Sequence, residues 1–399
     1  MKNLITFLLC TVLFISGFSQ TNTLPKPSGK YLTGITYLNF TDNTRKELFD
    51  NTGEKNRELT LKVWYPAETS TNPEPYFPDP EFAVTKLQYP ESFRDMKTNS
   101  SRDVPVSPGE TKYPVLIFSH GWGEHFSQNS ILMEELASLG YIIFSMAHHY
   151  ECKFSYYPDG RILNMDFQSQ RFQKIWREMQ NPKGMELLIK MYSASNDEER
   201  RQVFVEMGNL LPTGLIESPK YWAEDISFFI NRLKDINKEN ELFKNKLDLD
   251  RIGVFGMSMG GIASSEFCLT DNRIKAGISM DGGTGPSSLE KKFQIPFMYL
   301  NGKRFLGYGK LFTGRSASDC YSLSVRGSDH YNFTDHSIYP IPIVSRLLGE
   351  IDGKKVIEIT NVIVTAFFDK YLKEKQDINI IKEAKAFPEI EIASNINRN

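Results

Sequence analysis

Ser258 lies at the centre of Gly-Met-Ser-Met-Gly, residues 256–260, which fits the pattern G-x-S-x-G. A serine hydroxyl is a poor nucleophile at neutral pH, so it needs a general base, and that base needs a partner that orients it. A strand-like run, residues 251–256, precedes the serine and a helical pattern follows it. In this context, glycines two positions to either side permit a sharp turn that exposes the serine. We predict that Ser258 is the nucleophile of an acyl transfer; the alternative is an ordinary glycine-rich turn.

A second candidate element, Ser-His-Gly-Trp-Gly at residues 119–123, directly follows another apolar run. Acyl transfer builds negative charge on the carbonyl oxygen, and preorganised backbone N–H groups stabilise that charge. One donor comes from a loop after a buried strand, and the other from the residue after the nucleophile. We assign the oxyanion donors to the N–H groups of Trp122 and Met259. The alternative is that His120 and Gly121 simply form a tight turn.

The general base must come late in the chain, because triads built on this turn run in the order serine, acid, histidine. Only two of the six histidines, His330 and His336, follow Ser258. His330 comes three residues after a strand-like stretch that ends at Gly327, where a loop would carry it over the serine. His336 lies further along a polar loop. We therefore predict that His330 is the base.

The acid is less directly marked. In many enzymes of this type it follows the penultimate strand, but after the strand pattern at 295–302 no carboxylate appears until Asp319. The preceding strand pattern ends in Asp281, at the sheet edge where ligand chemistry gathers in open α/β sheets. We predict that Asp281 holds His330 in the correct tautomer. Asp319 is the alternative, whereas Asp329 adjoins His330 and would tend to point away from it.

The elements that position these residues alternate between strand-like and helix-like along most of the chain, which predicts an α/β fold with a largely parallel central sheet and helices on both faces. Residues 34–40 and 58–66 alternate apolar and polar residues, as in an antiparallel hairpin at a sheet edge. Residues 67–112 are rich in Pro, Ser, Thr and Asn and predict a long surface loop. Further strands are predicted within 112–123 and at 141–149, 251–256, 273–281, 295–302 and 321–327, and helices at 127–139, 218–233, 258–269 and 356–372.

The first 19 residues have the three parts of a secretory signal: Lys2, an apolar run over residues 4–15, and a small-x-small site at 17–19. The apolar run is shorter than the roughly 20 residues of a transmembrane helix. We predict a signal peptide at residues 1–19 and an exported protein, either periplasmic or secreted.

Residues 165–217 depart from the alternating pattern, with short helical stretches rich in methionine and aromatic residues. We predict that residues 20–399 form a single domain and that 165–217 is an inserted helical cap. This cap could form the acyl pocket or contact a lipid surface through adaptable side chains; the alternative is ordinary packing on the core. His148 and His149 end a predicted strand and are expected to line the pocket.

The formal net charge of −2 argues against a nucleic-acid partner and against a polybasic contact with anionic lipid. Cys152, Cys268 and Cys320 remain after removal of the signal, too few and too widely spaced for a disulfide framework. No Cys/His cluster has metal-ligand spacing. We therefore predict no disulfide, no metal and no cofactor, and leave the oligomeric state open.

Taken together, His-Gly-Trp-Gly, Gly-Met-Ser-Met-Gly-Gly, Met-Asp-Gly-Gly and residues 325–333 resemble the secreted platelet-activating factor acetylhydrolases, a family of α/β-hydrolases. The resemblance runs from about residue 31 to residue 372. The family is similar in placing its acid one strand earlier than usual, where Asp281 falls. Its base lies in an R-G-S-x-H-x-N-F stretch, which implies His330 here, and the histidine motif is the most specific part.

The resemblance implies an α/β-hydrolase fold and hydrolysis of short sn-2 acyl phospholipids through an acyl-enzyme. After the acid, however, the animal enzymes carry a bulky aromatic segment, whereas this chain has Gly-Gly-Thr-Gly-Pro at 282–286. A general short-chain carboxylesterase or a dienelactone-type hydrolase is therefore the alternative enzyme. A non-catalytic envelope binding protein on the same scaffold is the alternative outside enzymes.

Overall fold

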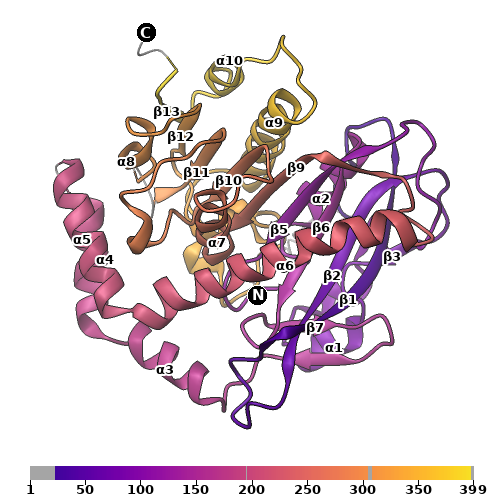
Figure 1. The fold of residues 1–399 in the computed structure, drawn as a ribbon, viewed down its shortest axis with the longest axis horizontal. Helices are drawn as coiled ribbons and strands as arrows, with labels where there is room; N and C mark the ends of the chain where they lie inside the picture. Colours follow the sequence, from indigo (N-terminus) through magenta and orange to yellow (C-terminus); the bar gives the residue numbers. More distant parts are fainter. Residues whose placement is uncertain (1–22, 195, 304–307, 397–399) are drawn as a thin grey trace, which may run out of the picture.

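The computed structural model describes residues 23–194, 196–303 and 308–396, and within them a sheet of 11 strands forms the centre of the molecule. Its order is β13-β12-β11-β10-β9-β5-β6-β2-β1-β4-β3 (Figure 1). The strands from β12 to β6 in this order all pair in parallel, so the prediction of a largely parallel sheet is confirmed. They are β5 (Tyr113–Ser119), β6 (Ile142–His148), β9 (Leu247–Met257), β10 (Ala276–Met280), β11 (Phe297–Asn301) and β12 (Cys320–Val325).

The predicted N-terminal hairpin is present as β1 (Leu32–Lys46) and β2 (Asn56–Ala67), which pair antiparallel. It does not form the edge of the sheet, because β4 (Lys97–Arg102) pairs with β1 and β3 (Pro73–Pro75) pairs with β4. The predicted long loop at 67–112 is thus only partly a loop, and it also contains α1 (Pro80–Thr85).

The strand β4 escaped prediction because its sequence, Lys-Thr-Asn-Ser-Ser-Arg, has no apolar alternation. Its polar groups are instead satisfied inside the protein by a carboxylate. Glu134 accepts hydrogen bonds from the Asn99 N–H at 2.8 Å and the Ser100 hydroxyl at 2.5 Å. At the opposite edge, β13 (Ile390–Ser394) adds an antiparallel strand to β12 that the sequence patterns also did not predict.

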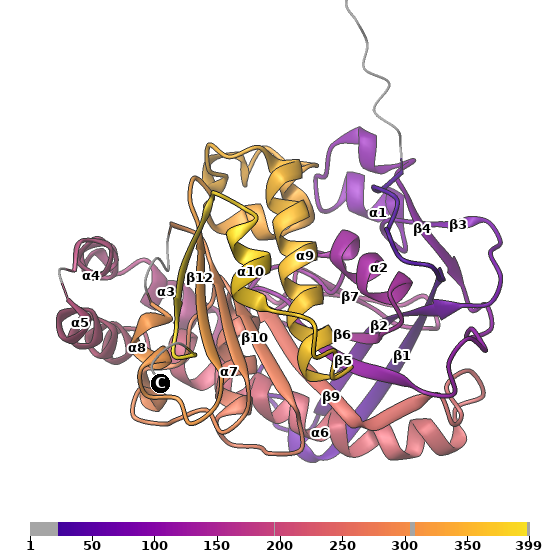
Figure 2. The ribbon, with the colours of Figure 1, turned by 90° about the horizontal axis from the view of Figure 1, so that it is seen from above.

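Helices cover both faces of the sheet, as predicted (Figure 2). One face carries α2 (Ser130–Ser138), α9 (Gly353–Tyr371) and α10 (Ile380–Lys385), and the other carries α6 (Ser218–Glu239) and α7 (Met259–Cys268). A short helix, α8 (Lys310–Thr313), lies between β11 and β12. Proline in the first turn of α6 and the Asp352 side chain capping α9 mark where these helices begin.

Between β6 and α6 the chain forms a short hairpin and then three helices at one end of the sheet (Figure 1). The hairpin pairs β7 (Phe154–Tyr156) with β8 (Ile162–Asn164). We call α3 (Gln170–Met179), α4 (Pro182–Ser193) and α5 (Asp197–Leu210) the cap helices. A π-helical turn, Thr213–Glu217, leads from them into α6.

That residues 20–399 form a single domain with a cap inserted at 165–217 stays a prediction, and the signal predicted at residues 1–19 lies outside the described residues. Among the helices that the structure describes, none is both long and apolar enough to cross a membrane. The three cysteines of the described chain are buried free thiols.

Candidate active site

Ser258 occupies the turn between β9 and α7 with φ 57° and ψ −122°, a backbone conformation that a non-glycine residue rarely adopts. Its N–H donates to the Met280 carbonyl at 2.8 Å. The flanking glycines are required by space: a Cβ on Gly256 would lie 2.3 Å from the carbonyl carbon of Gly260, and one on Gly260 would lie 2.1 Å from the Ser119 carbonyl oxygen. The turn therefore presents Ser258 from the carboxyl edge of the sheet.

The structure brings together the serine, the histidine and the acid named from the sequence. The Ser258 Oγ lies 3.0 Å from His330 Nε2, and His330 Nδ1 lies 2.5 Å from an Asp281 carboxylate oxygen. The second oxygen of Asp281 accepts the N–H of Gly302 at 2.8 Å. Because an ionised carboxylate only accepts hydrogen bonds, Nδ1 carries the imidazole proton and Nε2 is left to accept the serine proton. The arrangement can activate Ser258 as a nucleophile.

The other residues weighed for these roles lie elsewhere. Asp319, at the opposite end of β12 from His330, accepts the hydroxyl of Tyr371 at 2.6 Å. Asp329 caps the short helix that begins at His330 by accepting the His330 backbone N–H at 2.7 Å. The buried His336 lies 3.8 Å from Glu124. Only Asp281 faces the imidazole of His330 as a carboxylate partner within the described residues.

The loop at residues 119–123 packs directly on this turn, since a Cβ on Gly121 would lie 3.3 Å from the Ser258 Cβ. The Gly121 N–H donates to the Gln128 side chain at 2.9 Å, and the Gly123 N–H donates to the Glu151 carbonyl at 2.8 Å. The Trp122 N–H lies between these two anchored groups. The Met259 N–H begins α7, where a helix offers no backbone acceptor. Both predicted oxyanion donors thus come from backbone next to the nucleophile.

Comparison with known proteins shows the family to which the chain belongs. The family model for platelet-activating factor acetylhydrolase, isoform II, matches residues 16–191 and 228–386. The chain belongs to this family. It is 25% identical to platelet-activating factor acetylhydrolase from Cavia porcellus over 90% of this chain and 80% of that one, and 24% identical to the Canis lupus familiaris protein over 89% and 79%. The fold resembles that of ferulic acid esterase from Streptomyces cinnamoneus, with a TM-score of 0.68, 22% identity, and coverage of 93% and 99%.

The resemblance inferred from the sequence and the α/β-hydrolase fold are therefore confirmed, and this member of the acetylhydrolase family is a carboxylic ester hydrolase. The unmatched stretch between the two matched segments, residues 192–227, covers α5 and the start of α6. The match is thus interrupted in the region of the predicted cap.

In this acetylhydrolase-family protein, an aromatic side chain from the cap helices contacts the loop at residues 119–123. The half-buried Trp122 ring stacks on Phe172 of α3, with 5.7 Å between ring centroids and 16° between planes. Phe172 packs with Met165 and Ile175, and these buried side chains also contact Tyr150. The wall beside Trp122 is therefore apolar and largely aromatic, and it is built from the cap.

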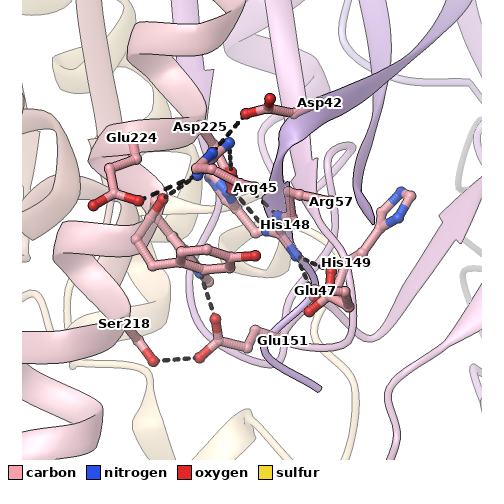
Figure 3. A network of polar contacts seen from close by, with 12 residues as sticks. Asp42, Arg45, Glu47, Arg57, His148, His149, Glu151, Ser218, Glu224 and Asp225 are labelled. Atoms are coloured by element: carbon pink, nitrogen blue, oxygen red, sulfur yellow. Dashed lines mark hydrogen bonds and ion pairs between the residues drawn. The ribbon is translucent and has the colours of Figure 1, made fainter. Parts of the chain in front are cut away.

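A buried polar network that the sequence patterns did not indicate lies behind the loop (Figure 3). Asp225 of α6 accepts hydrogen bonds from Arg57 of β2 at 2.6 and 3.1 Å, from Arg45 of β1 at 2.8 Å, and from His148 Nδ1 of β6 at 2.8 Å. Burial alone would raise the pKa of Asp225, but Arg57 and the His148 hydrogen bond hold it well below its usual range. His149 is buried beside this network as well.

One signal could have indicated this network. Asp225 occupies the apolar stripe of its helix, three residues after Trp222 and four before Phe229, both of which are fully buried. A carboxylate on such a stripe must be paired inside the protein, because an isolated buried charge is too costly. The sequence gives no indication, however, that its partners come from β1, β2 and β6.

Proposed function

We propose that this protein is an exported serine ester hydrolase in which Ser258, His330 and Asp281 form the catalytic triad. The hydrogen-bond series from Asp281 through His330 to Ser258 carries this proposal. Ser258 Oγ attacks the ester carbonyl while His330 Nε2 takes its proton, and Asp281 stabilises the resulting imidazolium. The N–H groups of Trp122 and Met259 receive the negative charge on the carbonyl oxygen.

The remaining steps release the alcohol and then hydrolyse the acyl-enzyme. His330 gives its proton to the departing alkoxide, which leaves as an alcohol, and the acyl group stays on Ser258 Oγ as an ester. His330 then takes a proton from water, whose oxygen attacks the acyl-enzyme, and returns that proton to Ser258 as the carboxylic acid departs. Every proton transfer passes through His330 Nε2, and no cofactor is required.

For the substrate, we propose a phospholipid with a short sn-2 acyl group, such as 1-alkyl-2-acetylglycerophosphocholine. Family membership supports this choice, since the relatives bear the name platelet-activating factor acetylhydrolase. Hydrolysis should be fast for sn-2 acetyl and fall steeply as the sn-2 chain lengthens. A panel of phosphocholines with sn-2 chains of graded length tests this, with the Ser258→Ala variant as the control.

Ser258→Ala should lose at least a thousandfold in kcat on phospholipid and on p-nitrophenyl acetate, because triad members act as a unit. Near-normal turnover by this variant would exclude the triad. A fluorophosphonate probe should label the wild-type protein and not Ser258→Ala; absence of labelling in the wild type would favour a non-catalytic binding protein.

A second candidate, a carboxylesterase of broader range, is favoured by the aromatic wall formed by Trp122 and Phe172. Flat aromatic groups stack well on such surfaces. The same panel should therefore include a feruloyl ester and an acetylated sugar. If these react faster than every phospholipid, the broader carboxylesterase is the better description.

Export is proposed from residues 1–19 and agrees with the tripartite pattern of a secretory signal. Cleavage after the small-x-small site should produce a mature chain that begins at Gln20. Mass spectrometry of protein recovered outside the cytoplasm tests this; an intact Met1 in that material would contradict it.

A further inference from the structure

A second Ser–His–Asp series lies behind the candidate active site, formed by Ser119, His148 and Asp225. The Ser119 Oγ lies 3.1 Å from His148 Nε2, and His148 Nδ1 lies 2.8 Å from Asp225. All three side chains are fully buried, so Ser119 has no access to a substrate. We propose that this series, which we call the buried relay, holds the oxyanion loop at residues 119–123 in its working position. The proposal rests on the function proposed above.

The direction of each hydrogen bond in the buried relay is fixed. Asp225 is an acceptor only, because its ion pairs with Arg57 and Arg45 keep it charged. His148 therefore donates from Nδ1, and burial lowers its pKa to about 4, so the ring is neutral and Nε2 is unprotonated. The Ser119 hydroxyl must then donate to Nε2. The relay thus fixes the orientation of the residue at which β5 ends and the oxyanion loop begins.

His120 extends this hold into the loop itself. Its Nε2 accepts the backbone N–H of His148 at 3.1 Å, so the ring proton is on Nδ1, which donates to the Gly121 carbonyl at 2.7 Å. Burial lowers the pKa of His120 to about 3, which keeps the ring neutral. The peptide unit between Gly121 and Trp122 is therefore restrained through its carbonyl, and its N–H is one of the proposed oxyanion donors.

Trp222 connects the buried relay with both donors. Its ring stacks on His148 at 3.9 Å with an interplanar angle of 8°, and it meets His120 edge-on at 5.0 Å. Trp222 also forms a buried cluster with Tyr221 and Ala263, and Trp122 and Met259 pack against this cluster. A displacement of His148 would therefore be transmitted to the two residues whose N–H groups face the developing oxyanion.

The ionic part of the network ties neighbouring elements together rather than adding stability by itself. Asp225 on α6 binds arginines on β1 and β2 and a histidine on β6 (Figure 3). Well-packed apolar residues would stabilise a core as well as a buried ion pair does, so the value of such a network lies in fixing geometry. An oxyanion donor must lie within about 2.7–3.1 Å of the developing charge, which makes its position sensitive to small shifts.

The test compares two variants of the buried relay with a matched control in the full-length protein. Ser119→Ala removes only the hydroxyl, and His148→Phe keeps a ring against Trp222 while losing both relay bonds. Ser138→Ala is the control, because Ser138 is equally buried but lies in α2; its hydroxyl donates to the Glu135 backbone carbonyl at 2.7 Å and accepts the Gly29 N–H at 3.0 Å, so the control loses at least as much hydrogen bonding as Ser119→Ala. For each protein, kcat and KM on p-nitrophenyl acetate are normalised to active sites titrated to completion with a fluorophosphonate.

A misplaced donor should lower kcat about ten- to a hundredfold with KM within threefold of wild type. A trifluoromethyl ketone forms a tetrahedral oxyanion adduct, so its inhibition of the relay variants should weaken in proportion to their loss of kcat. Partial unfolding would instead lower only the number of active sites titrated with the fluorophosphonate. Ser138→Ala should change neither quantity. If kcat per titrated site stays within threefold of wild type in Ser119→Ala, the inference is wrong. If His148→Phe does not fold, the result for Ser119→Ala alone tests the inference. A wild-type protein inert to ester and probe would instead refute the proposed function.

Discussion

At the scale of single residues, the placement of the proposed acid distinguishes this site. Asp281 follows β10, which pairs directly with β9, the strand that precedes Ser258. Its two carboxylate oxygens are divided between the Gly302 N–H and His330. Its backbone adopts φ 43°, so the carboxylate is directed by a turn as unusual as that at Ser258. The backbone at both positions is held in sparsely populated conformations, as is common where the fold fixes functional groups.

Asp281→Asn should therefore reduce kcat by about 10⁴-fold, because an amide donating to Nδ1 favours the wrong imidazole tautomer. Asp319→Asn should stay within a few fold of wild type, since Asp319 binds Tyr371 instead. Steady-state rates on p-nitrophenyl acetate check both. Retention of activity in Asp281→Asn together with loss in Asp319→Asn would move the acid to Asp319.

The residues of the proposed triad could be named from the sequence because the roles proposed for them impose local rules. The turn at Ser258 demands glycines, and chain order restricts the base to the two late histidines. Asp225 and Arg57 obey no such local rule, because each is defined by partners on distant strands. The sequence does not distinguish a buried charged residue from one on the surface. The one indication here is that Asp225 falls on the apolar stripe of its helix.

At the scale of elements, one cap helix contacts the candidate site. Phe172 on α3 stacks on Trp122, so this helix touches the loop proposed to offer an oxyanion donor. The ring is 6% exposed, in contrast with Ile189 on α4, which is 59% exposed. A displacement of α3 would therefore displace the Trp122 ring, whereas Ile189 of α4 faces solvent.

Phe172→Ala should lower kcat per titrated site about tenfold by releasing Trp122, and removal of this buried ring should also lower the free energy of unfolding by about 3–5 kcal/mol. Ile189→Ala should leave kcat unchanged, because its side chain has little packing to lose. Titrated rates and urea unfolding of both variants provide the measurement. Equal kcat in the two variants would show that the cap does not position the loop.

At the scale of the whole molecule, the core contains a cation, Lys62, that has no carboxylate in hydrogen-bond contact among the residues that the structure describes. Lys62 of β2 is fully buried, with its Nζ 3.3 Å from the Ser127 hydroxyl and 4.6 Å from the Trp64 ring centroid. Burial lowers the pKa of Lys62 to about 8, although Glu134 opposes the shift. The folded protein therefore bears a cost for charging this residue that the unfolded chain does not.

Because the folded pKa lies below the unfolded value, this cost is complete below pH 8 and disappears as pH rises to about 10.5. Lys62→Met should stabilise the protein by about 3 kcal/mol at pH 7, the shift converted at about 1.4 kcal/mol per unit. The advantage should shrink by pH 10. Urea unfolding at the two values measures it, with exposed Lys55→Met as the control; a difference independent of pH would contradict the assignment.

Hydrophobic periodicity in the sequence predicted the strands that are mostly apolar and missed strands that are not. The central strands β5 and β6 are mostly apolar and buried along their whole length, and such strands are typical of the middle of a parallel sheet. The polar strand β4 is held by Glu134, and β13 by pairing with β12, and both depend on contacts distant in sequence. The interior strand β4 and the edge strand β13 therefore escaped prediction because neighbouring elements stabilise them.

The position of Asp281 has a consequence for how this enzyme could diversify. In the proposed triad, the segment after β11 supplies a backbone N–H from Gly302 and no acidic side chain. Substitutions at the exposed described positions between Gly302 and the start of β12 would leave all three triad side chains on their own strands and turns. Lys303, Lys310, Gly314 and Ala317 are therefore where laboratory evolution should tolerate variety at little cost in turnover, whereas the buried Tyr308, which donates to the Thr284 carbonyl, should be retained.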